Sequence, residues 1–167
     1  MQDADLLLTT AQIGMALAGF AGLVTALRRP GAATDVLNEI RFRSMIELSL
    51  TLAVFSLLPF VLTELWLSEA GSWRAASAVY AGAAAFFLAY SVRRNRRMIG
   101  RVLLTGGITA SLMGVCVAEA GALGLNALGV FPGAEAGVYL AALFVHFLAA
   151  AFFFIRLLYG AFPHDAP

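Results

Sequence analysis

Long apolar runs separated by short polar segments are the dominant pattern along this chain. At about 1.5 Å per residue, a helix of about 20 residues crosses the roughly 30 Å hydrocarbon core of a bilayer. Five runs are long enough to do so, and they cover about 5–27, 44–67, 75–92, 102–125 and 138–159. The pattern therefore predicts an all-α integral membrane protein, with a single transmembrane domain over 1–167 and five spanning helices.

The composition of the chain agrees with this fold class. Of its 167 residues 61% are hydrophobic and 13% are charged, and the mean hydropathy is +0.86. An average soluble domain has about 25% charged residues. The sequence has no G-x-S-x-G, H-E-x-x-H, P-loop or dinucleotide-binding motif. We therefore expect neither an enzyme nor a cofactor, and no nucleic acid as a partner.

The arginines predict how the helices are oriented. All eleven basic residues are arginine, and short loops rich in Arg stay on the cytoplasmic side. Four lie between the first and second runs, five between the third and fourth, and Arg156 lies near the C-terminus, whereas Arg74 alone falls on the opposite side. This count predicts an outside N-terminus and a cytoplasmic C-terminus, in a bacterial inner membrane.

The arginine cluster that follows the third run has a second possible role. Its members are Arg93, Arg94, Arg96, Arg97 and Arg101. Such a loop is sufficient to set topology, and guanidinium groups also bind phosphate well. We expect the topological role first, with contact to anionic lipid or phosphate as the alternative.

The fourth run carries a carboxylate, Glu119, well inside the predicted span. An acidic residue near a helix centre costs about 2.5 to 3.5 kcal/mol on insertion scales, so it usually has a partner or a function. Counting the helical rise from the outer ends places Gln12, Glu119 and His146 at a similar depth, with Glu64 shallower. These four residues are the predicted ion- or proton-binding site, with His146 as the partner of Glu119. The alternative is a glutamate that only fixes helix packing.

Hydroxyl residues form stripes at helical spacing on two of the runs. Ser49, Ser56 and Thr63 recur every seventh residue, and Thr105 and Thr109 share a face with Glu119. We expect these stripes to line a polar path, and the alternative is hydrogen bonding between helices. Ser56 is also placed to satisfy the carbonyl that Pro59 frees in the second run. No metal site is expected.

Small residues recur every fourth position on the first and fourth runs, as Gly14, Ala18, Gly22 and Ala26, and as Gly106, Ala110, Gly114 and Ala118. Ridges of this kind let two helices approach closely. Five helices with so few polar positions are too few to enclose a water-filled path within one chain. The sequence therefore favours a homo-oligomer. The sequence therefore predicts a small oligomeric channel or transporter for cations or protons. The alternative is a non-transporting scaffold or accessory subunit that contacts anionic lipid or a partner protein.

Overall fold

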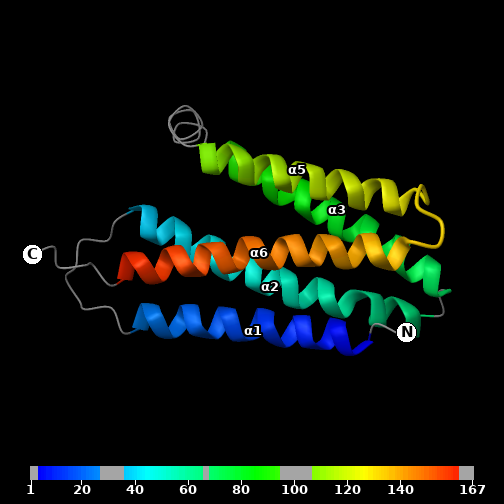
Figure 1. The fold of residues 1–167 in the computed structure, drawn as a ribbon, viewed down its shortest axis with the longest axis horizontal. Coiled ribbons are helices and arrows are strands. Elements are labelled where there is room, and N and C mark those ends of the chain that lie inside the picture. Colours follow the sequence, from blue (N-terminus) through cyan, green and yellow to red (C-terminus); the bar gives the residue numbers. More distant parts are fainter. Residues whose placement is uncertain (1–3, 27–35, 66–67, 95–106, 162–167) are drawn as a thin grey trace, which may run out of the picture. The chain divides into compact units, whose positions relative to one another are not determined.

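Five α-helices make up the described part of the chain in this computed structural model (Figure 1). The structure describes the backbone of residues 4–26, 36–65, 68–94 and 107–161 and most of their side chains. The helices are α1 (Ala4–Ala26), α2 (Val36–Glu64), α3 (Glu69–Arg94), α5 (Gly107–Ala127) and α6 (Glu135–Ala161). Over these residues the predicted all-α fold is confirmed.

Three of the five helices contain stretches long and apolar enough to cross a membrane. These stretches are Ala4–Val24, Phe42–Glu64 and Glu135–Leu158. In α5 the described apolar stretch is shorter, Gly114–Ala127. The helix α3 is long enough but less apolar, because it is rich in alanine and begins and ends with charged residues. Among the described residues, length and composition thus support three of the five expected spans.

The third helix begins earlier than the expected third span. α2 ends at Glu64 and α3 already begins at Glu69, instead of near residue 75. Ser68 starts this helix, because its hydroxyl oxygen accepts a hydrogen bond from the Gly71 backbone N–H at 3.1 Å and its carbonyl accepts one from the Ser72 backbone N–H at 2.8 Å. A serine in this position satisfies N–H groups that have no partner inside the helix.

The connection between α5 and α6 is a tight turn with two glycines in the left-handed region, Gly129 (φ 75°) and Gly133 (φ 82°). It is shorter than the expected link over 126–137, because α5 runs to Ala127 and α6 begins at Glu135. Side chains other than glycine rarely adopt such φ values, so both positions favour glycine.

The helix α2 continues through Pro59. The Ser56 hydroxyl donates to the carbonyl of Leu52 at 2.7 Å, and the Thr63 hydroxyl donates to the carbonyl of Pro59 at 2.9 Å. The expected role of Ser56 at the carbonyl of Phe55 is therefore wrong. A serine inside a helix bonds back to the carbonyl four residues earlier, which is the nearest acceptor.

The chain divides into two compact units, which are described separately. Unit one comprises Met1–Leu58 and Leu143–Pro167, and unit two comprises Pro59–Ala142. In unit one, α1 packs on the first part of α2 at Gly14, where an added Cβ would lie 2.7 Å from the Ser49 carbonyl oxygen. Further along, buried Ala21, Met45 and Leu157 form an apolar core. Glycine at position 14 thus permits the close approach of the two helix backbones.

The small-residue ridges make only part of the expected contacts. In the first ridge Gly14 is buried against α2, but Gly22 is exposed with no atom within 4 Å of an added Cβ. A four-residue step turns about 40° around a helix, so three steps carry a ridge well away from its contact. In the second ridge Gly114 is equally open. Gly106 lies outside the described residues, and the side chain of Ala110 is not described.

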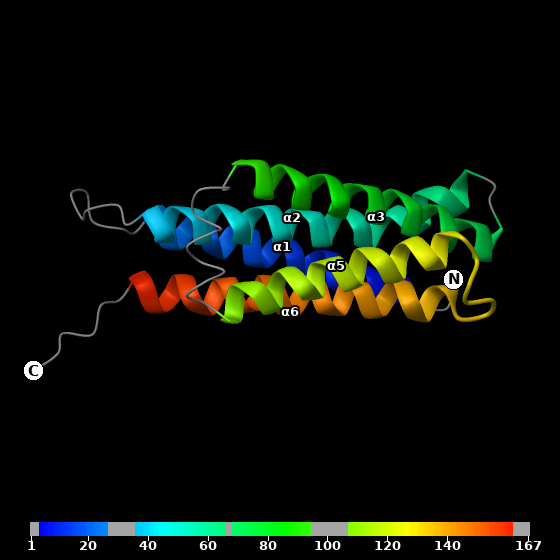
Figure 2. The ribbon, with the colours of Figure 1, turned by 90° about the horizontal axis from the view of Figure 1, so that it is seen from above.

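Unit two is built around the packing of α3 on α5, which lie side by side in both ribbon views (Figures 1 and 2). The turn after α5 leads into the first two turns of α6, which belong to the same unit. Several polar side chains of this unit are buried, among them Ser77, Glu119, Asn126 and Glu135. The candidate site lies among them.

Candidate functional site

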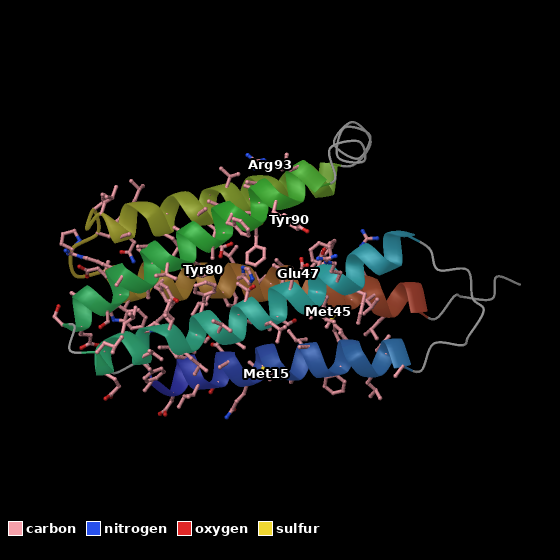
Figure 3. All side chains as sticks on the ribbon, turned by 180° about the vertical axis from the view of Figure 1, so that it is seen from behind. Met15, Met45, Glu47, Tyr80, Tyr90 and Arg93 are labelled. Atoms are coloured by element: carbon pink, nitrogen blue, oxygen red, sulfur yellow. The ribbon has the colours of Figure 1, made fainter. Side chains whose placement is uncertain are left out.

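Glu119 lies on α5 and is hydrogen-bonded to a tyrosine on α3. The Tyr80 hydroxyl donates to Glu119 Oε1 at 2.7 Å, and only 8% of Glu119 and none of Tyr80 is exposed. Figure 3 labels Tyr80, whose side chain projects from α3. A short hydrogen bond to a carboxylate is among the stronger kinds, and it offsets part of the cost of burying the acid. Glu119 is therefore buried within a helical unit, and its role in binding an ion or a proton stays a prediction.

Two further aromatic rings lie beside Tyr80. Tyr139, near the start of α6, meets Tyr80 edge to face with 5.9 Å between ring centroids, and Trp73 lies 5.5 Å from Tyr139. Tyr139 and Trp73 are also buried. Aromatic rings pack favourably in such tilted arrangements, which hold the Tyr80 ring in place. The tyrosine that contacts Glu119 is therefore held by α3 and α6 together.

A second polar contact joins α3, α5 and α6 in the same unit. Asn126 donates through Nδ2 to the Ser77 hydroxyl at 2.8 Å and to the main-chain carbonyl of Glu135 at 2.9 Å. Asn126 and Ser77 are fully buried. Because the carbonyl can only accept, these two bonds fix which side of the amide carries the nitrogen. Asn126 thereby fastens the end of α5 to both neighbours.

An ion pair joins α3 to the turn that follows α5. Arg74 Nη2 lies 2.7 Å from Glu135 Oε1, and Glu135 Oε2 accepts the Gly133 backbone N–H at 2.8 Å. The Arg74 side chain is 41% exposed and that of Glu135 only 7%. The guanidinium also lies against Gly129, where an added Cβ would be 3.1 Å from Arg74 Cζ. This ion pair therefore holds the α5–α6 turn on α3.

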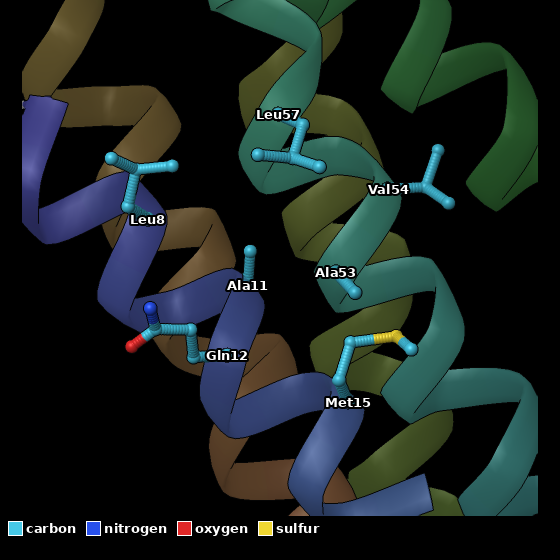
Figure 4. A pocket seen from close by; sticks show the side chains of 7 residues that line it. All are labelled: Leu8, Ala11, Gln12, Met15, Ala53, Val54 and Leu57. Carbon is cyan, nitrogen blue, oxygen red and sulfur yellow. The ribbon is translucent and has the colours of Figure 1, made fainter.

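Of the other three predicted site residues, His146 and Gln12 belong to unit one and Glu64 belongs to unit two. His146 lies half-buried on α6 in unit one, so its pairing with Glu119 stays a prediction. Gln12 is exposed on α1, also in unit one, where it borders a groove of about 490 Å³. Figure 4 shows its amide pointing away from the α2 side chains that line this groove. Glu64 is exposed at the end of α2.

The hydroxyl stripe of α2 consists of Ser49, Ser56 and Thr63. The hydrogen bonds that the structure describes for it run within α2 itself. Ser56 and Thr63 donate to carbonyls of their own helix. Ser49 is fully buried, and its Oγ has no hydrogen-bond partner among the described residues. A pore-lining role for this stripe therefore stays a prediction, and two of its three hydroxyls have a structural use.

Several predicted residues fall outside what the structure describes. Thr105, Arg96, Arg97 and Arg101 lie outside the described residues, and the side chains of Thr109 and Arg94 are not described. Arg93 is exposed on the last turn of α3. A contact of this arginine cluster with anionic lipid stays a prediction.

Sequence reasoning missed the hydrogen bond from Tyr80 to Glu119 and the network around Asn126. A signal for both exists, because Trp73, Ser77 and Tyr80 share one face of α3 at steps of four and three residues. Glu119 and Asn126 stand seven residues apart on α5 and so also share a face. Polar residues at helical spacing on two neighbouring helices indicate one polar interface, although they do not show which residues pair.

Comparison of the chain with protein-family models, with curated proteins and with solved structures finds no match in any of the three.

Proposed function

We propose that this protein is a small channel or transporter of five membrane helices that binds a proton or a small cation at Glu119. The observation that supports this most is the Tyr80–Glu119 hydrogen bond of 2.7 Å at a carboxylate that is 8% exposed. Burying an acid in an apolar helix is costly, and intramembrane acids mark ion and proton pathways more often than chance.

Charge on the predicted outer side supports a positive cargo. Arg74 is the only arginine expected there, and its charge is offset by Glu135 at 2.7 Å. The other described acids on that side, Asp5, Glu64 and Glu69, are exposed. An excess of exposed carboxylates raises the local concentration of cations near an entrance.

The exposed amide of Gln12 supports the proposed homo-oligomer. α1 is apolar enough to span a membrane, so an exposed amide on it would face hydrocarbon in a single chain. Amide side chains in membranes form hydrogen bonds between helices, and the neighbouring exposed Gly19 leaves room for one to approach. In a homo-oligomer Gln12 gains a partner from a second copy.

Flux into liposomes tests the proposal. The purified protein is reconstituted in its native sequence and as Glu119→Gln, which keeps the side-chain shape but removes the charge. We expect uptake of protons or monovalent cations by the native protein and at least a tenfold slower uptake by Glu119→Gln. Equal rates for the two, at equal protein content, contradict a role for Glu119 in transport.

A specific observation also supports the second candidate, a non-transporting scaffold. Asn126 donates hydrogen bonds to both Ser77 and the main-chain carbonyl of Glu135 inside unit two, an arrangement that fixes helices without any ligand. On this proposal Glu119 and Tyr80 form one more structural contact. Unchanged flux in Glu119→Gln, together with a large loss of its stability, favours the scaffold.

A further inference from the structure

An exposed stripe runs along α1, beside the face of this helix that packs on α2. Its members are four, three and four residues apart, which keeps them on one side of the helix, and they are Leu8, Gln12, Met15 and Gly19. All four are exposed and belong to unit one. Two membrane helices that pack along their length use residues at this spacing. The α1 stripe therefore has the pattern of a helix-packing surface, although no described helix of unit one covers it.

The α1 stripe contains one polar side chain, the amide of Gln12. Among the described residues this amide makes no hydrogen bond, and it points away from the α2 side chains of the neighbouring groove (Figure 4). α1 is apolar enough to span a membrane, where an amide without a partner is costly. The acyl chain of a lipid offers neither a donor nor an acceptor. Whatever covers the stripe must therefore carry a polar atom at the depth of Gln12.

A second copy of this chain supplies such an atom. An amide has both donors and an acceptor, so two glutamines related by a twofold axis can each donate to the other. Copies inserted with the same orientation can place α1 beside α1 in parallel, and Gln12 of one copy then meets Gln12 of the other at equal depth. A single amide in an otherwise apolar stripe also fixes the register of two helices, as a buried asparagine does in coiled coils.

The glycine of the α1 stripe permits two helices to approach closely. An added Cβ at Gly19 would meet no atom within 4 Å, so nothing in the described part of the chain requires glycine at this position. Glycine inside a helix carries an entropic cost, and small residues let membrane helices pack tightly. Leu8 and Met15, on the N-terminal side, are 46% and 59% exposed, so they can pack around the pair of amides and exclude lipid.

We propose that the α1 stripe is the surface by which two copies of this protein pair, as parallel helices in register at Gln12. This inference rests on the homo-oligomer of the proposed function and names its surface and symmetry, but it does not depend on transport. Leu8 and Met15 also border the groove whose α2 wall includes Val54 and Leu57. The α1 helix of the second copy can therefore gain apolar contacts from α2 as well.

Disulfide cross-linking tests the face and the register of the pairing. The native cysteine is removed as Cys116→Ala, and one cysteine is introduced as Met15→Cys or, in the control, as Ile13→Cys. Both positions are exposed, but two residues turn about 200° around a helix, so Ile13 lies nearly opposite the stripe. After oxidation in lipid vesicles we expect a linked dimer from Met15→Cys and little from Ile13→Cys, because a disulfide needs Cα atoms less than about 7 Å apart. Equal yields, or a higher yield from Ile13→Cys, overturn the proposal.

Energy transfer between labelled copies in vesicles, measured as lipid dilutes them, tests the amide and the glycine. Gln12→Leu removes the pair of amides but keeps a side chain of similar size, and Gly19→Leu fills the space between the helices. We expect each to weaken association about tenfold, and Gln12→Asn, which keeps an amide, to weaken it less. Gly82→Leu is the matched control, because Gly82 is also an exposed helical glycine with open space around an added Cβ, but it lies on α3. It should leave association unchanged.

The outcomes separate this inference from the proposed function. Association that keeps its strength in both Gln12→Leu and Gly19→Leu shows that another surface joins the copies, which overturns the inference and leaves the oligomer standing. Native protein that stays single at every dilution contradicts both the inference and the proposed oligomer. Flux measured in the same vesicles tests transport independently. Pairing through the α1 stripe without any flux supports the inference and contradicts transport.

Discussion

Replacing Gly14 by alanine tests the close packing of α1 on α2 in unit one. The added Cβ would lie 2.7 Å from the Ser49 carbonyl oxygen and 3.1 Å from the Ala53 backbone nitrogen. Both atoms belong to the backbone of α2, so neither can turn away as a side chain would. The two helices must separate by several tenths of an ångström to admit one methyl group.

The size of the effect follows from two opposing contributions. Alanine is favoured over glycine inside a helix by about 0.5 to 1 kcal/mol. Overpacking a tight interface costs about 1 to 3 kcal/mol. We therefore expect Gly14→Ala to lower the free energy of unfolding by about 1 to 2 kcal/mol. Gly22→Ala is the matched control, because its Cβ meets no atom within 4 Å, and it should raise stability slightly.

The assay is reversible unfolding in detergent micelles titrated with sodium dodecyl sulfate, followed by circular dichroism. The quantity compared is the difference in unfolding free energy between the two alanine variants, which we expect to be about 2 kcal/mol. If Gly14→Ala is as stable as Gly22→Ala, the two backbones do not approach as described. The account of α1 packing is then wrong.

Three further predictions concern the network of unit two, and the same unfolding assay measures each of them. Arg74→Ala leaves Glu135 without its cation and should lower the free energy of unfolding by about 1 to 2 kcal/mol, a loss that the partial exposure of Arg74 limits; an effect near zero means that this ion pair does not hold the α5–α6 turn on α3. Gly129→Ala should destabilise more than Gly133→Ala, since both have positive φ but only the first meets a side chain, that of Arg74; equal losses rule out that contact. Asn126→Leu keeps the volume but removes two buried hydrogen bonds and should cost about 2 to 4 kcal/mol, whereas a stable variant contradicts the network.

The hydrophobic pattern predicts where the helices lie but not where they end. α1 runs from Ala4 to Ala26, close to the expected 5–27, because Asp5 and the arginines at 28 and 29 enclose one continuous apolar run. α3 begins well before the expected residue 75, since hydropathy marks where apolar residues start. Helix starts are set by capping groups, here the hydroxyl and carbonyl of Ser68.

The predictability of the site differs from residue to residue. Glu119 is conspicuous in the sequence because a carboxylate inside an apolar run is costly. Its partner Tyr80 is not conspicuous, since tyrosine occurs equally at interfaces and in cores. Depth along the membrane suggested His146, whose pairing with Glu119 stays a prediction, because depth leaves the rotation of a helix about its axis undetermined. A hydrogen bond needs that rotation as well, and only the packing of α3 on α5 supplies it for Tyr80.

The two buried acids of unit two, Glu119 and Glu135, differ in the bonds that are described for them. The Glu135 carboxylate has a cation on one oxygen and a backbone N–H on the other, so a proton or ion must displace an existing partner to bind there. Glu119 Oε1 accepts the hydroxyl of Tyr80 at 2.7 Å. The bonds of Glu135 hold the α5–α6 turn on α3 and so give this acid a structural use. For this reason the role proposed for Glu119 does not extend to Glu135, although both are buried acids of the same unit.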